Sequence, residues 1–391
     1  MVEDKKAGTA SNLEPFELER FFAKWEFEAK HLLCCSDCEP LAMSNLIEHA
    51  DAECRKLWDD LVLGYTMSNG SDELRKEIAT LYDNVQPDDI NILVPEEGIY
   101  LSMLALLSAG DHVVVTFPGY QSLYEVARSL GCHVHYWKPR IDPKTGRVHF
   151  DTEDLRSIVE AHPIKLVVVN FPHNPTGKTL SRDQHADVVE MCRNRGAFLF
   201  SDEMYRLLEY EDKDRLPAAV DCYDKAVVLC GSSKSLSCPG LRIGWIASKD
   251  GAFMKRLAEL KDYTTICPSG PSEVLALMAI RQRDRIVRKN LEIISQNIAK
   301  LEKFCETHSA HIAWDPPAAG SIAFPRILCS PDQGIGSWCE DLVRSRDVLL
   351  LPASVYKEET LTEDRRVRFG LGRAGIDEGL ERLAQFFKES S

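Results

Sequence analysis

The sequence contains no apolar run long enough to cross a membrane, which takes roughly 18–20 consecutive apolar residues. Residues 1–19 are polar and contain no apolar signal-peptide segment. No tract of Lys and Arg stands out against a formal net charge of −14, which argues against a nucleic-acid-binding protein. These absences predict a cytoplasmic protein that binds neither a membrane nor a nucleic acid.

Paired metal-ligand motifs are also missing. The 13 cysteines are scattered, and an odd number in a chain without a secretion signal is typical of free thiols. One cluster, formed by His31, Cys34, Cys35 and Cys38, has the composition of a zinc site, but no second Cys/His pair at metal-ligand spacing accompanies it. We therefore predict no metal and expect these cysteines to be buried as small hydrophobic side chains.

What the sequence does have is length and a regular alternation of elements. Its 391 residues are enough for two or three lobes. Residues 1–14 are expected to be disordered. Apolar periodicity predicts helices over residues 16–33, 45–62 and 71–82, with a turn-rich loop at 63–70. Further along, apolar runs predict strands at 92–94, 112–116, 133–137, 165–170, 197–201, 226–230 and 243–247.

Strands of nearly continuous Val, Ile and Leu, separated by helices, are typical of a parallel sheet covered on both faces. We predict an α/β fold with N-terminal helices (15–60), a large ligand-binding domain (61–290) and a smaller α+β domain (291–391). The N-terminal helices are expected to join the small domain in part, and a long helical stretch is expected over 273–305. Because such sheets bind ligands at the carboxyl ends of their strands, functional residues are expected in the loops that follow them.

Five of these loops contain residues suited to ligand binding. Taken singly, each has an ordinary structural explanation, such as a packing turn or a helix cap. Together they follow five strand ends, which those explanations do not anticipate. The motifs are Gly98 at a helix start, Phe117-Pro-Gly-Tyr120, Phe171-Pro-His-Asn174-Pro-Thr-Gly177, Asp202-Glu-Met-Tyr205 and Gly231-Ser-Ser233-Lys234.

Lys234 carries the sharpest hypothesis. It lies between two apolar strands, after Ser233 and eight residues before Arg242. A lysine between buried strands is costly unless its charge has a use. A surface lysine in a turn of small residues is the alternative. We hypothesise that Lys234 forms a Schiff base with pyridoxal 5′-phosphate (PLP) and that Arg242 holds an anion nearby.

With these motifs the sequence resembles the fold-type I PLP-dependent enzymes of the class I/II aminotransferase family. The resemblance covers roughly residues 60–390 and is most specific in the segments HNPTG (173–177), SDEMY (201–205) and SSK…GLRIGW (232–245). It implies an aspartate-aminotransferase-like fold with a mostly parallel seven-stranded sheet between helices. It also implies a PLP-dependent transaminase that moves the amino group of an L-α-amino acid to a 2-oxo acid by a ping-pong mechanism.

The resemblance further implies roles around the cofactor ring. Lys234 forms the aldimine and later moves the proton. Asp202 pairs with the pyridine nitrogen, and a buried carboxylate keeps that nitrogen protonated. Tyr205 and Asn174 hydrogen-bond the phenolic oxygen, and Tyr120 stacks on the ring.

For the cofactor phosphate, the resemblance implies backbone N–H groups of Gly98 and Ile99 together with Ser233 and Arg242. A helix start and an arginine suit a dianion. Tyr65 would reach the phosphate of the neighbouring subunit, which implies a homodimer.

Arg368, with Asn174, would bind the substrate α-carboxylate, since a guanidinium matches a carboxylate with two parallel N–H bonds. Arg373 is a candidate for the second carboxylate of a dicarboxylic substrate, but its direction is open.

Three features depart from the family's pattern. Glu96 and Glu97 lie beside the phosphate loop, where they either point to solvent or bind a cationic substrate. Gly231 replaces a serine, so one phosphate hydroxyl is missing. The segment 36–41 replaces the small, Gly-bearing segment that closes over the substrate in relatives. These departures leave open a PLP-dependent lyase, cyclase or decarboxylase, and the amino donor and acceptor are not predicted. A non-enzymatic binding protein is the remaining alternative, although all the core residues are present.

Overall fold

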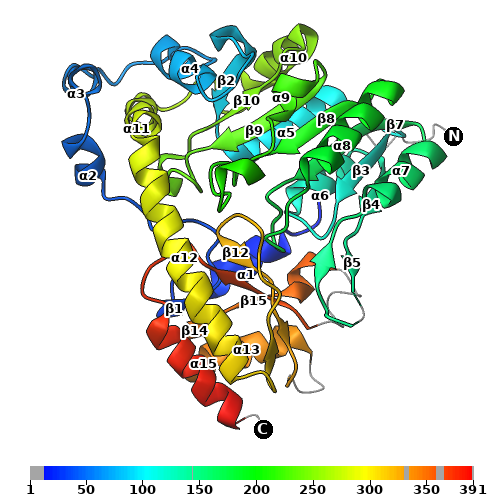
Figure 1. The fold of residues 1–391 in the computed structure, drawn as a ribbon. Helices are drawn as coiled ribbons and strands as arrows, with labels where there is room; N and C mark the ends of the chain where they lie inside the picture. Colours follow the sequence, from blue (N-terminus) through cyan, green and yellow to red (C-terminus); the bar gives the residue numbers. More distant parts are fainter. Residues whose placement is uncertain (1–12, 143, 330–333, 358–364, 390–391) are drawn as a thin grey trace, which may run out of the picture.

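A computed structural model describes residues 13–142, 144–329, 334–357 and 365–389. Residues 1–12 of the disordered tail predicted over 1–14 therefore lie outside the described residues. The chain forms a large lobe around one sheet and a smaller α+β lobe (Figure 1). Helix α12 (Arg283–Thr307) runs from the large lobe into the small one, and the predicted domain boundary at residue 290 falls inside it. Among the described helices, none has the length and apolar character that crossing a membrane requires.

The large lobe is built on a seven-stranded sheet in the order β2-β10-β9-β8-β7-β3-β4. Only β10 is antiparallel to its neighbours, which confirms the predicted α/β fold with its mostly parallel sheet. The strands are β2 (Ile90–Leu93), β3 (His112–Thr116), β4 (His133–Trp137), β7 (Ile164–Asn170), β8 (Phe198–Asp202), β9 (Ala226–Gly231) and β10 (Gly244–Ala247).

The strands are apolar on both sides because helices cover both faces of the sheet. Along β3, Val113 and Val115 pack into one core and Val114 into the other, as the two-residue period of a strand requires. One core includes side chains of α5 (Pro95–Leu106), α6 (Ser122–Ser129) and α10 (Gly251–Lys261). The other includes α4 (Asp72–Ala79), α7 (Thr152–Ala161), α8 (Arg182–Arg195) and α11 (Gly270–Arg281). With both faces closed, ligands have access at the strand ends.

The small lobe combines short strands with two helices. Strands β12 (Ile322–Ala323), β16 (Val367–Gly370) and β15 (Leu351–Pro352) form one antiparallel sheet, and β11 (Ile312–Ala313) pairs with β13 (Arg326–Ile327). Helices α13 (Ile335–Arg346) and α15 (Asp377–Glu389) pack against each other.

The helix predicted over 16–33 is wrong in its second half. Helix α1 spans only Glu17–Trp25, and β1 (His31–Leu32) then pairs in parallel with β14 (Val348–Leu349). The local periodicity favoured a longer helix, but the backbone of β1 gains hydrogen bonds to a strand more than 300 residues away. Such tertiary pairing routinely overrides local propensity.

Two other predicted helices are each divided in two. The helix expected over 45–62 is α2 (Met43–Glu48) followed by α3 (Ala52–Asp59). The break is at Asp51, whose carboxylate accepts the Cys54 N–H at 2.8 Å and so caps the new helix. The stretch over 273–305 is likewise α11 and α12, separated at Gln282.

The segment after β1 is fixed across the end of β16. The Gly370 N–H donates to the Leu33 carbonyl at 2.7 Å, and the Glu39 N–H donates to the Gly372 carbonyl at 2.8 Å. A Cβ on Gly370 would overlap the Cys35 carbonyl oxygen, so glycine is required for this close approach. The segment 33–39 is therefore part of the small lobe and is held by backbone bonds at both ends.

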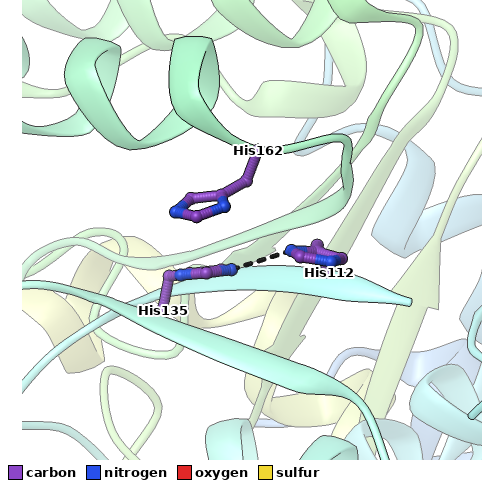
Figure 2. Close-up of side chains that lie close together, drawn as sticks. All are labelled: His112, His135 and His162. Carbon is purple, nitrogen blue, oxygen red and sulfur yellow. Dashed lines mark hydrogen bonds between the residues drawn. The ribbon is translucent and has the colours of Figure 1, made fainter. Parts of the chain in front are cut away.

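Three histidines lie close together, away from the carboxyl ends of the strands where ligands are expected (Figure 2): His112 at the start of β3, His135 in the middle of β4 and His162 two residues before β7. The two ring nitrogens His112 Nδ1 and His135 Nε2 lie 3.0 Å apart, while the rings of His135 and His162 stack at 4.0 Å. Partial burial, and then the neighbouring histidines, lower the pKa of His112 and of His135. A metal lies in the plane of each imidazole that binds it, and stacked rings do not direct their lone pairs to one point. The group is best described as packed imidazoles.

Candidate active site

A cavity of about 410 Å³ lies at the carboxyl ends of the sheet strands, between the two lobes. Its walls come from α1, the segment 35–37, the start of α5 and the loops after β3, β7, β8 and β9. The cavity brings together most of the residues that the sequence predicted for the site: Ile99, Tyr120, Asn174, Asp202, Tyr205, Ser233, Lys234, Arg242 and Arg368. The structure thus places these predicted residues around one cavity at the carboxyl ends of the strands.

Lys234 lies three residues beyond β9, and its amine is inside the cavity. Nζ donates a hydrogen bond to Ser36 Oγ at 2.8 Å and lies 5.9 Å from the ring centre of Tyr205. Burial lowers the pKa of Lys234, and the nearby Arg368 guanidinium lowers it further, while Asp37 opposes the shift. A lysine with a lowered pKa is closer to the neutral amine that attacks a carbonyl.

Asp202 is the last residue of β8 and is only 5% exposed. One carboxylate oxygen accepts the Met204 N–H at 3.1 Å. Burial raises the pKa of Asp202 to about 7, because few neighbours stabilise the negative charge. A cation brought by a ligand would stabilise the charged form of this buried carboxylate.

A hydrogen-bonded chain joins the floor of the cavity to the small lobe. Asn170 donates to the backbone carbonyl of Asp202 at 3.0 Å and accepts the Asn174 N–H at 2.8 Å. Arg368 Nη1 donates to Asn174 Oδ1 at 3.1 Å, and its Nε donates to the Cys34 carbonyl at 3.1 Å. Arg368 is 2% exposed, so its orientation is fixed before any substrate arrives.

The start of α5 differs from the expectation in one respect. Gly98 is the fourth residue of the helix, and its N–H donates to the Val94 carbonyl at 2.9 Å. Its missing Cβ faces the sheet, where it would lie 2.7 Å from Leu93 Cδ1. Gly98 therefore allows close helix packing, which corrects its predicted contact with an anion. The unbonded N–H groups of the first turn are those of Glu96 and Glu97.

The side chains at this end of the cavity are suited to an anion. Ser233 Oγ is buried without a hydrogen-bond partner among the described residues, and Arg242 lines the cavity beside it. Gly231 is closely packed, because a Cβ there would lie 3.1 Å from Gly244 Cα and 3.2 Å from Pro95 Cγ. A larger residue at this position would require these neighbours to shift by a few tenths of an ångström.

Glu96 and Glu97 have different surroundings. Glu97 points away from the cavity, where it accepts the Thr265 hydroxyl at 2.9 Å and caps the Val94 N–H at 3.3 Å. Glu96 lines the cavity and accepts the Ser122 hydroxyl at 3.3 Å. Burial raises the pKa of Glu96, and the carboxylate of Glu19 adds to the shift.

Sequence reasoning missed several residues of the N-terminal segment and one strand-end asparagine. Their position in the cavity depends on long-range packing, and only Asn170 carried a signal, since it ends a predicted strand. The sequence left the direction of Arg373 open. In the structure Arg373 forms a bidentate ion pair with Asp37, with Nε 3.0 Å from Oδ1 and Nη2 2.9 Å from Oδ2. Ser36 and Asp37 belong to segment 36–41, which the sequence singled out without giving either residue a role. Residues of the cavity wall that were not predicted include Leu18, Glu19, Phe22, Glu26 and Asn170.

Two further expectations concern residues outside the cavity. Tyr65 does not line it and is 94% exposed on the surface of this chain. Cys34, Cys35 and Cys38 are buried, as expected for small hydrophobic side chains, and burial raises the pKa of Cys38 to about 12.

Comparison with known proteins identifies the family to which this chain belongs. The model of the family described as aminotransferase class I and II matches residues 33–387. The chain belongs to this family. It is a PLP-dependent aminotransferase with an aspartate-aminotransferase-like fold.

Relatives include aspartate aminotransferase from Sulfurisphaera tokodaii, which is 27% identical over 348 residues, 85% of this chain and 84% of that protein. Among solved structures, a PLP-dependent aminotransferase from Streptococcus suis matches with a TM-score of 0.87 and 28% identity, covering 97% of this chain and 99% of the other. The PLP-dependent cyclase OrfR matches with a TM-score of 0.86 and 27% identity, covering 97% of this chain and 98% of the other.

The residues present fit PLP. The unpartnered Ser233 hydroxyl and the start of α5 suit its phosphate, and the buried Asp202 carboxylate suits its ring nitrogen. When bound, PLP supplies an electron sink for the pair left at the substrate Cα. The amine of Lys234, which lies in the same cavity, is the group that could bond the aldehyde of PLP.

Asp202 should destabilise the cofactor-free enzyme at neutral pH. Its folded pKa of about 7 lies above the ordinary 3.8, so the folded state binds the extra proton between these values and loses stability as the pH rises through them. Asp202→Asn removes this cost. Urea unfolding of the cofactor-free proteins should favour the variant by about 2–4 kcal/mol more at pH 8 than at pH 4. The exposed Asp224→Asn should show no such trend, and a trend of the opposite sign for Asp202→Asn would contradict this account.

Proposed function

We propose that Lys234 carries the cofactor and moves the proton during transfer of an amino group from an L-α-amino acid to a 2-oxo acid. The observation that supports this most is the amine of Lys234 in a buried cavity, with a lowered pKa, beside the carboxylate of Asp202 and the guanidinium of Arg368. In this proposal each of the three groups acts on a different part of the ligand.

Arg368 holds the substrate α-carboxylate and so fixes the amino acid relative to the Lys234 amine. Asp202 holds a proton on the pyridine nitrogen, because a buried carboxylate is stabilised by that positive charge. Tyr205 and Asn174 orient the ring through its phenolic oxygen, and Tyr120 stacks on it. Lys234 Nζ would take the proton from the substrate Cα and deliver it to C4′, the former aldehyde carbon of PLP.

The phosphate seat combines Ser233, Arg242 and the free N–H groups of Glu96 and Glu97, while Ile99, one residue beyond Gly98 in α5, contributes to the cavity wall. A helix start offers backbone donors and a positive dipole end to a dianion. The side chain of Glu97 points away, so it does not oppose the phosphate.

Lys234→Ala should abolish the visible absorbance of the bound cofactor that depends on its bond to lysine. It should also lower amino transfer by about 10²–10⁴-fold or more, because the proton carrier is lost. Absorbance spectra and single-turnover assays with one amino acid at a time measure both effects. Lys255→Ala, an exposed lysine on α10, is the matched control and should behave as the parent enzyme. Unchanged turnover in Lys234→Ala would overturn the proposal.

A second candidate outcome is cyclisation, elimination or decarboxylation on the same cofactor. The observation favouring it is the similarity in fold to the cyclase OrfR, together with an N-terminal segment that departs from the family's pattern. Product analysis of the same reactions distinguishes them, since amino transfer yields a 2-oxo acid and the alternatives yield ammonia, a cyclic product or carbon dioxide.

We propose in addition that the enzyme is a cytoplasmic homodimer. Tyr65 lies in a loop that Thr66 ties to the Pro268 carbonyl at 2.7 Å. This loop and its neighbour expose a patch of apolar side chains that a second copy would cover. The patch comprises Val62, Leu63, Tyr65, Met67, Tyr263 and Ile266. All 13 cysteines are free thiols, which suits a reducing compartment.

Subunit complementation tests the role of Tyr65. Tyr65→Ala should weaken cofactor retention, and Lys234→Ala should be inactive. If Tyr65 serves the neighbouring site, a mixed dimer of the two variants contains one site with neither defect. Mixing should therefore restore activity and tight cofactor binding relative to either variant alone. A monomer in light scattering, or no recovery in dimers shown to have exchanged subunits, would contradict the proposal.

A further inference from the structure

The cations around the cavity already have partners or assigned tasks. Arg373 is paired with Asp37 through both prongs of its guanidinium. Arg368 donates hydrogen bonds to Asn174 and the Cys34 carbonyl, and the proposed function assigns it the substrate α-carboxylate. Because Arg373 is neutralised by Asp37, it is not available as the binding group for a second substrate carboxylate.

The carboxylates on the α1 side of the cavity have no such partners. Glu19, Glu26 and Glu96 all line the cavity, and none forms an ion pair with a lysine or arginine in the part of the chain that the structure describes. Glu19 accepts only the Tyr120 hydroxyl, at 3.2 Å, and Glu96 only neutral hydroxyls. The cavity is a ligand site on independent grounds, because it also holds the buried, unpartnered Ser233 hydroxyl.

These carboxylates also act on one another. Burial raises the pKa of Glu26, and the charges of Asp37 and Glu19 add to the shift, although Arg373 and Lys234 oppose it. Glu19 raises the pKa of Glu96 in the same way, so Glu19 is close to both of the others. A cation placed among them would relieve this repulsion and the cost of burial together.

Helix α1 also places apolar side chains beside the acidic groups. Glu19 and Phe22 are three residues apart on α1, and Glu26, the residue that directly follows the helix, is four residues beyond Phe22, so these side chains lie on the same side. Together with Leu18 they line the cavity. Leu18 and Phe22 offer apolar surface, and Glu19 and Glu26 offer charge. A side chain with a methylene stem and a cationic head matches both properties.

We propose that the amino donor of this enzyme has a cationic side chain, an ammonium or guanidinium group held by Glu19 and Glu26 with its methylenes against Phe22 and Leu18. This inference rests on the proposed function, since it names the substrate class of the same site. Asp37, by neutralising Arg373, acts as a specificity determinant against dicarboxylic acids.

The test compares donors that differ only in the charged head. L-Lysine is paired with L-norleucine, and L-arginine with L-citrulline, with L-aspartate as the dicarboxylic donor. Conversion of the bound cofactor is followed spectrally for each. The cationic member of at least one pair should show a kcat/KM about 10- to 100-fold higher than its neutral partner, the range of a charged hydrogen bond. L-Aspartate should be the poorest donor.

Variants assign the preference to residues. Glu19→Gln and Glu26→Gln should each lower kcat/KM for the preferred cationic donor about tenfold or more. Both should leave the neutral donor within about threefold, a split that general loss of folding would not produce. Glu28→Gln, an exposed carboxylate two residues after Glu26, is the matched control. Binding to Lys234→Ala, measured by calorimetry with the same donors, gives a readout that does not depend on turnover.

The outcomes separate the two proposals. If neutral or dicarboxylic donors are converted as well as cationic ones, or the Gln variants change all donors equally, the inference fails while the aminotransferase proposal stands. If no donor passes its amino group to any 2-oxo acid, the proposed function fails as well.

Discussion

The structure depends on the cost of burying one lysine. Lys234 Nζ lies in a cavity between two lobes, and burial is the main cause of its lowered pKa. A charged amine there would be expensive, so the fold favours the neutral amine that can bond to a carbonyl. Across the cavity, Asp202 is also buried and its pKa is raised to about 7. Burying the amine of Lys234 or the carboxylate of Asp202 alone is unfavourable. A bound cofactor would offset both costs, because it would supply a carbonyl to Lys234 and a ring cation to Asp202.

The two lobes contribute different parts of this arrangement. The sheet presents Lys234, Asp202 and the start of α5 from its strand ends. The small lobe adds Arg368 from β16, and the segment 33–39, bonded across β16, places Ser36 within 2.8 Å of the lysine amine. Helix α1 then forms one wall with Glu19 and Glu26. In the proposed function, the large lobe would therefore hold the cofactor, and the segments attached to the small lobe would select the substrate.

The sequence was sufficient to predict the sheet and the residues that follow the ends of its strands. Nearly continuous apolar strands predict a parallel sheet, and such strands end at one edge, so Asn174, Asp202 and Lys234 were expected to meet there. The sequence was not sufficient to predict the hydrogen bond between Ser36 and Lys234, which are 198 positions apart. The position of Ser36 depends on β1, and the position of β1 depends on its pairing with β14. Gly98 was misplaced by one helical turn, although Pro95 at the first helical position was a usable signal.

The central claim is that Lys234 bonds the cofactor. Borohydride reduction of the holoenzyme, followed by proteolysis and mass spectrometry, tests it directly, because reduction makes the bond permanent. The account predicts a pyridoxyl group on the peptide that contains Lys234, and its loss when the enzyme is first saturated with a good amino donor. A pyridoxyl group on another lysine, such as the buried Lys261 or Lys178, would contradict it.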